Sequence, residues 1–406
     1  MQSANQSDLK ILPGTEPRLV GPVLPTIETH AAHADETRSI HRDVISALKS
    51  NDIMRAAATR EIGGIEASIT AIGEELSAVA QACANTAWCL WNHLSVFHLF
   101  VGTLGPEHAH SLRQLVEKHA WVSFPAGAGS GVHGRALRNN PTFALNGRAA
   151  WGSGTRYADW TGVVFAVVDD QGDLIRPLDL RFSIVPTNSE GLTIDPTWDG
   201  ASLRASATDD IHYEDVVVDA AQCARWFGAN RAESLREVPV IHPRYREDWV
   251  GLSDIWLGWM GVGLVGRALE NACSGIANRR AIMGNKMVER PTIQLNIGRA
   301  GALFEAARGT MVQIADEVDE RISAAAVPDT ADYLRQMATT SMALNQLDEA
   351  MQLLARTQGG ASLREQSAFE RRARDFRAFP LHINAHQDRV THQLGRHLLS
   401  LPLEPF

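Results

Sequence analysis

The sequence is poor in features that mark several large classes of protein. It has four cysteines, at positions 83, 89, 223 and 273, and no CxxC pair, so we expect free buried thiols in a reducing compartment. The net charge is −9 and no basic stripe is present, which argues against a nucleic-acid partner. The most apolar stretch, residues 250–265, contains Asp254 and is shorter than the roughly 18 clean residues of a membrane span.

The first residues also lack the basic and apolar regions of a secretory signal, which favours a cytoplasmic protein. The chain of 406 residues is 45% hydrophobic and 21% charged, a composition typical of soluble globular proteins. This length is too great for one simple core and suits two or three subdomains.

Strand patterns are concentrated in one region between two long helical blocks. Helical spacing of apolar residues predicts helices over 35–50, 68–84, 85–104, 107–118, 248–281, 294–325, 330–356 and 380–399. Apolar or β-branched runs predict strands at 163–168, 182–185, 192–194 and 211–218, and Asn146-Gly147 predicts a turn. We therefore predict an α + β chain: an N-terminal helical domain (1–120), a middle β domain (121–220) and a C-terminal four-helix-bundle-like domain (221–406).

One glycine motif is a poor match to the chemistry that it suggests. Residues 129–134, GSGVHG, fit the GxGxxG pattern of dinucleotide-binding folds. That site needs a helix opening at the third glycine and an acidic residue about 20 positions later. Neither is present, so we expect these glycines to form a loop at the rim of a site.

The segment beginning at Asn146 carries the most informative pattern. Two glycines around Ser153 let the backbone approach a flat group and present a hydroxyl to it. The segment resembles the middle domain of the acyl-CoA dehydrogenase fold, and more narrowly the flavin-dependent monooxygenases with that fold, whose pattern is close to G-R-W-x-F-x-S-G…W. The matching residues are Gly147, Arg148, Trp151, Ser153, Gly154 and Trp160. A second motif of that group, W-x-x-x-G-L/M-R-G-T-G-S, resembles Trp198, Leu203, Arg204, Ala205, Ser206, Ala207 and Thr208.

The resemblance covers about residues 35–400 and implies an N-terminal helical domain, a middle β-barrel and a C-terminal helical bundle. It implies that Ser153 lies beside the flavin N5 and that Trp151, Gly154, Arg204 and Ser206 contribute to the flavin site. The reading that needs no resemblance is a turn serine that caps its own loop.

His382 is the second candidate catalytic residue. The run from Arg374-Asp375 to His382 resembles the monooxygenases' R-D-(x)6-H, whose histidine faces the substrate. We expect His382 in the first turn of the last helix, where the helix dipole disfavours imidazolium. A neutral imidazole can accept a proton from a phenol or an amine. A buried structural histidine is the alternative.

Other parts of the chain supply further candidates. The aromatic helix at 85–104 contains His93, His98 and Trp88, which with Trp151 are candidate substrate-pocket residues, although helices of this kind are usually core. No metal site is expected, because the His382/His386 pair has no third ligand at a suitable spacing.

The resemblance also implies a contact with FAD pyrophosphate in a neighbouring subunit. It places Arg280 and the Gln358-Gly359-Gly360 turn there, since arginine suits a phosphate and glycines let backbone N–H groups approach it. A salt bridge and a helix break are the alternative, and with FMN these contacts would have no partner.

Two observations favour oxygenation over dehydrogenation: the expected glutamate base is missing, and His382 stands at the histidine position of the monooxygenases. Acyl-CoA dehydrogenases need a glutamate base that commonly lies about nine residues after the arginine–aspartate pair, yet residues 376–387 contain no acid. The predicted function is therefore oxygenation of an aromatic, phenolic or other small organic substrate by O₂ and reduced FMN or FAD through a C4a-hydroperoxyflavin. A separate NAD(P)H-dependent reductase would supply the flavin, and a homotetramer is expected. Alternatives are an acyl-CoA dehydrogenase or oxidase with a displaced base, N- or S-oxygenation, and a scaffold that has lost flavin.

Overall fold

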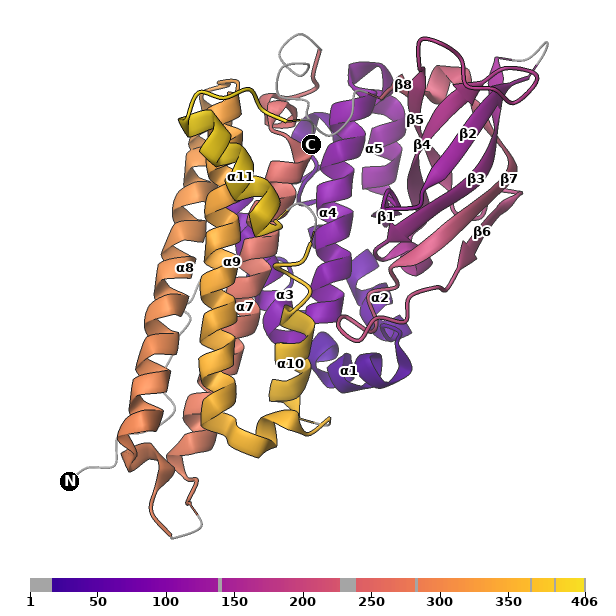
Figure 1. The fold of residues 1–406 in the computed structure, drawn as a ribbon. Helices are drawn as coiled ribbons and strands as arrows, with labels where there is room; N and C mark the ends of the chain where they lie inside the picture. The colour runs from indigo at the N-terminus through magenta and orange to yellow at the C-terminus, as the bar shows by residue number, and fades with distance from the viewer. Residues whose placement is uncertain are drawn as a thin grey trace.

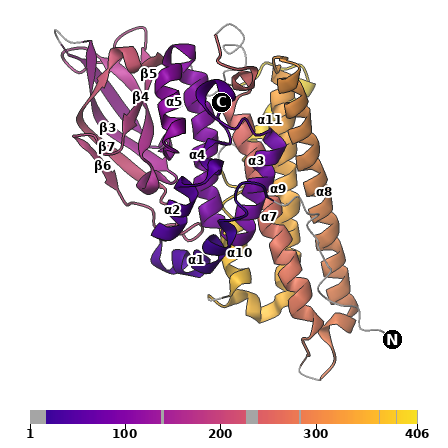
Figure 2. The same ribbon diagram turned by 180° about the vertical axis from the view of Figure 1, so that it is seen from behind.

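The computed structural model describes residues 17–137, 141–226, 239–281, 284–365, 367–382 and 385–404. A β sheet, a group of N-terminal helices and a bundle of long C-terminal helices lie side by side (Figure 1). Helix α4 (Ala84–Leu104) lies between the sheet and the bundle in both views (Figure 2). The predicted order of helical, β and helical segments is confirmed.

The N-terminal helices are built around α4, which is buried along almost its whole length because it is apolar on nearly every face. The predicted helix at 35–50 is two helices, because Arg38 adopts a left-handed φ of 55° that ends the first of them. Ser68 begins the third helix by accepting a hydrogen bond from the Ala71 N–H. The helices are α1 (Leu24–Thr37), α2 (Arg42–Lys49), α3 (Ile69–Ala82), α4 and α5 (Ala109–Glu117).

The strands form one mixed sheet with the order β6-β7-β3-β2-β4-β5-β8, and β1 pairs with β4. Among the described residues, the end strands β6 and β8 do not pair with each other, so the sheet is open at that seam. Its own core includes Leu145, Phe165 and Tyr213. The strands are β1 (Val122–Ser123), β2 (Gly131–Ala136), β3 (Thr142–Gly152), β4 (Trp160–Val168), β5 (Leu180–Pro186), β6 (Leu192–Asp195), β7 (Asp209–Asp219) and β8 (Ala224–Arg225).

Two local predictions for this region are wrong. Asn146 and Gly147 lie inside β3, where the register with β7 shifts, so they form a bulge and not a hairpin turn. Gly147 has φ +130°, and a Cβ there would collide with the Gly131 carbonyl. The third glycine of the GxGxxG run, Gly134, lies in strand β2 against the Phe165 ring, and not in a loop.

The C-terminal bundle contains the longest helices of the molecule. Its members are α7 (Trp249–Ala277), α8 (Pro291–Ser323), α9 (Thr330–Gln358), α10 (Ala368–Phe376) and α11 (Gln387–Leu398). The prediction of a helix beginning at Pro380 is wrong: residues 377–382, after α10, are turns, and α11 begins at Gln387. None of the helices described here is long and apolar enough to cross a membrane.

Candidate active site

Ser153 lies in the turn that follows β3 and is 7% exposed. The Trp88 Nε1–H donates a hydrogen bond of 2.9 Å to the Ser153 Oγ. That oxygen is also 3.0 Å from the Thr208 Oγ1, which is 2.7 Å from the Ser206 Oγ. Because an indole nitrogen only donates, the Ser153 hydroxyl keeps its own proton available for Thr208 or for a ligand.

The segment that carries Ser206 and Thr208 is held by a buried polar network. Asp375 accepts hydrogen bonds from the Leu203 N–H (2.8 Å) and the Asn85 Nδ2 (3.1 Å). Asn85 in turn accepts from the Ala205 N–H at 2.7 Å. Burial raises the Asp375 pKa to about 7, and the Leu203 hydrogen bond and the charge of Arg374 oppose that rise.

Sequence reasoning did not assign a role to Asn85, Thr208 or Asp375. Thr208 stood inside the matched motif, and Asp375 stood inside the arginine–aspartate pair, so the signals were present. What was missing was the knowledge that these distant segments meet.

His382 lies in the segment between α10 and α11, with its ring packed edge-on against Trp91 (5.1 Å between centroids) and Trp88 (5.6 Å). Trp88 therefore contacts both catalytic candidates, Ser153 and His382. Desolvation lowers the His382 pKa to about 4, and the positive charge of Arg389 adds to this effect. A neutral imidazole is thus expected, as predicted, but burial is the cause and not the N-terminal dipole of a helix.

The two histidines of α4 contact backbone groups. His93 accepts a hydrogen bond from the Val122 N–H at its Nδ1 (3.1 Å), and its Nε2 lies 3.0 Å from the Met54 carbonyl. Both His93 nitrogens are therefore engaged by the protein. The His98 Nε2 lies 2.9 Å from the Glu247 carbonyl, and its ring packs near Tyr245. These contacts favour structural roles for both residues.

The residues around Ser153 fit a flat aromatic ligand. Trp151 has a left-handed φ of 68° and is 58% exposed, although large hydrophobic side chains are usually covered. Its ring meets Trp198 edge-on at 5.9 Å, so an aromatic ledge stands beside the serine turn. Gly154, also left-handed at φ 72°, is held by a hydrogen bond from its N–H to the Ser206 carbonyl. A hydroxyl, a close backbone turn and an exposed indole are groups that a flavin ring could use.

Three other predicted flavin contacts do not join this cluster. Arg204 is 3.8 Å from Asp35 in an ion pair. Arg280 donates to the nearby Gly284 carbonyl at 2.9 Å and is exposed. The Gln358 carbonyl accepts from Arg279 at 2.9 Å, which brings the Arg280 region and the Gln358-Gly359-Gly360 turn together. This second cluster lies where α7 and α9 end, at the far end of the bundle from α11 (Figure 1).

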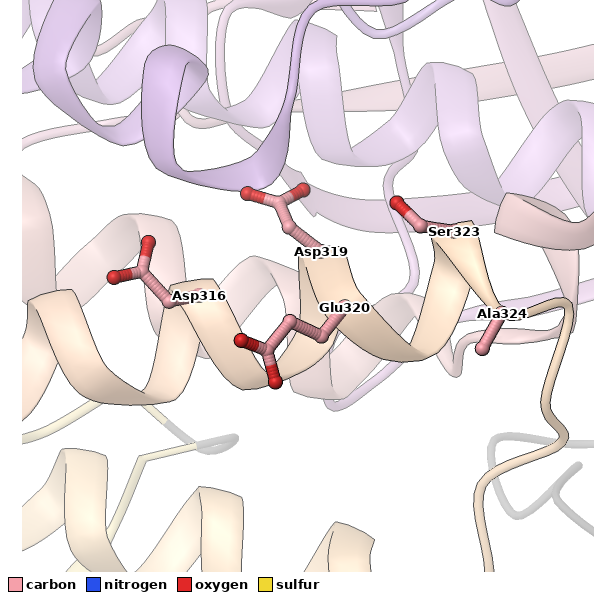
Figure 3. Close-up of a pocket in the computed structure, with 5 residues that line it drawn as sticks. All are labelled: Asp316, Asp319, Glu320, Ser323 and Ala324. Carbon is pink, nitrogen blue, oxygen red and sulfur yellow. The ribbon is translucent and has the colours of Figure 1, made fainter.

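An acid-lined hollow of about 580 Å³ lies elsewhere, on α8 (Figure 3). Two of its carboxylates already act within the fold: Asp319 accepts from the Ile69 and Thr70 N–H groups, and Asp316 accepts from the Thr70 hydroxyl. These two carboxylates therefore stabilise the start of α3, and the position of the hollow does not suggest a catalytic site.

Comparison with known proteins agrees with this arrangement. Residues 255–387 match the family described as the acyl-CoA dehydrogenase C-terminal domain. The chain is 27% identical to indole-3-acetate monooxygenase of Pseudomonas putida over 313 residues, covering 75% of this chain and 74% of that one. It is 26% identical over 412 residues to the oxygenase component of the FADH2-dependent resorcinol hydroxylase of Rhizobium sp., covering 95% and 94%.

Solved structures show the same fold. The XiaF protein of Streptomyces sp., in complex with FADH2 and glycerol, has a TM-score of 0.84 at 17% identity and covers 95% of both chains. FMN-bound dibenzothiophene monooxygenase TdsC of Paenibacillus sp. A11-2 has a TM-score of 0.80 at 17% identity, covering 95% of this chain and 98% of that one. The chain therefore has the acyl-CoA dehydrogenase fold, and the predicted resemblance to flavin-dependent monooxygenases with this fold is confirmed.

Proposed function

We propose that this protein is the oxygenase component of a two-component flavin-dependent monooxygenase. The observation that carries the proposal is the position of Trp88, whose indole donates to Ser153 and packs against His382. A hydroxyl suited to a flavin and an imidazole suited to a substrate thus lie on the same aromatic side chain. The relatives that are named monooxygenases support the same reading.

The bound reduced flavin, FMN or FAD, would supply the activation of O₂. Ser153 would hold the flavin N5 through its hydroxyl proton, which Trp88 leaves free because the indole is itself a donor. Thr208 competes for that proton in the absence of flavin, at 3.0 Å. The Trp151–Trp198 ledge would cover the flat ring.

His382 would orient the substrate or accept its proton from a phenol-like or amine group. Its lowered pKa keeps the imidazole neutral and able to accept at neutral pH. Trp88, Trp91 and Phe379 surround this position with apolar surface. Such walls exclude water and would limit the loss of reactive oxygen as peroxide.

The partners follow from the same proposal. A separate NAD(P)H-dependent flavin reductase would deliver reduced flavin, as the name "oxygenase component" implies for the resorcinol enzyme. We also propose a homotetramer, in which Arg280 and the Gln358-Gly359-Gly360 turn approach the flavin of a neighbouring subunit.

The test is anaerobic mixing of the protein with reduced FMN, and separately with reduced FAD, followed by rapid exposure to O₂. We expect a flavin absorbance spectrum distinct from the oxidised form that persists for seconds or longer and decays faster in Ser153→Ala. The flavin that gives the longer-lived spectrum is the cofactor.

Two results would contradict the proposal. Immediate reoxidation with no distinct spectrum, in a protein that is purified with bound FAD and is bleached by an acyl-CoA, would identify a dehydrogenase. Failure to bind either flavin would indicate a scaffold without catalysis.

A further inference from the structure

Asp254 is a buried carboxyl group that the proposed chemistry does not use. It lies in α7 with 0% exposure, and neither of its oxygens has a hydrogen-bond partner within the described part of the chain. Buried polar groups almost always have partners, because an unsatisfied one destabilises the folded state. An acid retained under such conditions needs an explanation outside the stability of the fold.

The surroundings of Asp254 place it at the junction of three helices. Gly251, three residues earlier in α7, faces Tyr333 and Gln336 of α9. Gly258, four residues later, faces Thr340 of α9. Residues at this spacing share one helix face, so Asp254 faces the same side of the bundle. The charges of Arg389, in α11, and Asp248 also act on Asp254.

This junction adjoins the proposed substrate position. The carbonyl of Ser253, next to Asp254, accepts a 2.8 Å hydrogen bond from Trp91, whose ring packs against His382. Arg389 acts electrostatically on both Asp254 and His382. Helix α10, which precedes the segment carrying His382, packs against α7.

A second unsatisfied group strengthens the case. The Thr340 hydroxyl is fully buried and also has no hydrogen-bond partner among the described residues. The Thr340 methyl group contacts the Gly258 position, one helical turn from Asp254. Asp254 of α7 and Thr340 of α9 therefore both have polar atoms that could bind a ligand.

We propose that Asp254 is a substrate-binding residue that accepts a hydrogen bond from an N–H or O–H group of an aromatic substrate. This inference rests on the proposed function and narrows its substrate class: the molecule carries a donor on the part that enters between α7 and α9. An aromatic ring with no such donor leaves the carboxyl unsatisfied and binds poorly. Burial raises the Asp254 pKa well above its usual range, and Arg389 partly opposes this. The carboxyl oxygen that carries no proton is the acceptor for the incoming donor.

The first measurement is thermal stability without ligand. Asp254→Leu replaces an unsatisfied carboxyl by an apolar group of similar size, and we expect an unchanged or higher Tm. Asp375→Leu is the matched control: this carboxyl is equally buried but accepts two hydrogen bonds, so its removal should lower the Tm by several degrees. A Tm loss in Asp254→Leu as large as in the control would show that Asp254 is structural and overturn the proposal.

The second measurement is equilibrium binding of matched probes: indole against benzothiophene, and phenol against fluorobenzene. The members of each pair have similar shapes, but only indole and phenol carry a donor. We expect the wild-type protein to favour the donor in at least one pair by about tenfold or more. Asp254→Leu should abolish the preference, and Asp254→Asn, which keeps an acceptor oxygen, should retain part of it. A wild-type protein with no preference in either pair, or a preference that survives Asp254→Leu, would overturn the proposal.

These outcomes are separable from failure of the proposed function. The persistent flavin spectrum after O₂ exposure is recorded without substrate and does not require Asp254. We expect Asp254→Leu to form it as the wild-type protein does. If the wild-type protein fails to form this spectrum, the oxygenase proposal fails. The binding comparison still decides whether Asp254 accepts a hydrogen bond from a ligand.

Discussion

His382 shows how one residue type acquires a defined protonation state from its position. Its ring packs against Trp88 and Trp91, and desolvation lowers its pKa to about 4 from a usual value of about 6.5. The unfolded chain therefore takes up a proton more readily between pH 6.5 and pH 4. The stability that His382 contributes is present above this window and is lost as the pH falls through it.

The first prediction concerns the pH dependence of substrate oxidation. Because His382 must be neutral to accept a proton, the acid limb of kcat/KM that depends on His382 should lie near pH 4, well below the pH near 7 at which Asp375 takes up its proton. The measurement is the initial rate with saturating reduced flavin across this range, and the acid limb should disappear in His382→Gln together with most of the activity. An acid limb near pH 6.5 that disappears in His382→Gln would mean that the imidazole is solvated and not enclosed.

The second prediction concerns the hydrogen bond that orders Ser153. Trp88→Phe removes the indole N–H but keeps an aromatic ring. The Ser153 Oγ then loses the donor that orients its hydroxyl. We expect faster decay of the oxygen-dependent flavin spectrum, by several-fold, with an effect smaller than that of Ser153→Ala. Trp91→Phe is the control, because the Trp91 nitrogen donates to the Ser253 carbonyl and not to Ser153. Equal decay in wild type and Trp88→Phe would show that Ser153 does not depend on this bond.

At this scale the sequence identified residue types better than it identified partners. Ser153, Trp88 and His382 were all singled out, yet no sequence pattern showed that Trp88 contacts both of the others. The sequence did not decide between a pocket role and a core role for His93 and His98, because a histidine in an aromatic helix can bind backbone or substrate. Only the positions of the Met54, Val122 and Glu247 backbone groups separate these roles.

At the scale of elements, the segment from Ser202 to Thr208 depends on contacts far away in the chain. Leu203 and Ala207 adopt left-handed φ values of 49° and 46°, which cost free energy for residues other than glycine. Hydrogen bonds to Asp375 and Asn85 hold the segment in this conformation. The related motif has glycines where this chain has alanines. Glycine adopts such a backbone conformation easily, so in this chain the hydrogen-bond network must hold the segment in it.

The third prediction tests this network. Asp375→Asn places an amide where one of two donors, the Leu203 N–H or the Asn85 Nδ2, must lose its acceptor. We expect a loss of roughly 1–3 kcal/mol in the free energy of unfolding, and several-fold weaker flavin binding because Ser206 and Thr208 shift. Urea unfolding and flavin titration measure the two effects. Ser202→Ala, which removes one bond to the Arg374 carbonyl, should have a smaller effect on both. Loss of stability with unchanged flavin affinity would mean that the network does not position the site.

The long helices were predictable because apolar periodicity specifies them, whereas several boundaries and strands were not. The helix expected from Pro380 begins at Gln387. Before it, the His382 N–H donates to the Phe379 carbonyl in a turn, and the Phe379 side chain is buried. Strand β2 was missed because Gly131 and Gly134 favour a loop locally, and only pairing with β3 and β4 makes them extended. Tertiary pairing overrode local preference at both places.

At the scale of the whole molecule, the predicted flavin contacts fall into two groups. One surrounds Ser153 between the sheet and α4, and the other combines Arg280 with the Gln358-Gly359-Gly360 turn where α7 and α9 end. Within one chain these groups do not meet. Both groups can contact the same flavin only if a second subunit brings its Arg280 region to the extended end of that flavin. The proposed homotetramer would supply this geometry.

The fourth prediction follows from this division. FAD carries a pyrophosphate and adenosine that FMN lacks, so Arg280→Ala should weaken FAD binding by about tenfold and leave FMN binding nearly unchanged. Arg290→Ala, another arginine of the α7–α8 connection, is the control and should change neither. If Arg280 acts across subunits, dilution that dissociates the oligomer, followed by light scattering, should weaken FAD binding of the wild-type protein to the level of Arg280→Ala and have no further effect on the variant. A variant that loses affinity for both flavins equally would place Arg280 in the fold of its own subunit, and a dilution-independent loss of FAD alone would place it on its own subunit's flavin.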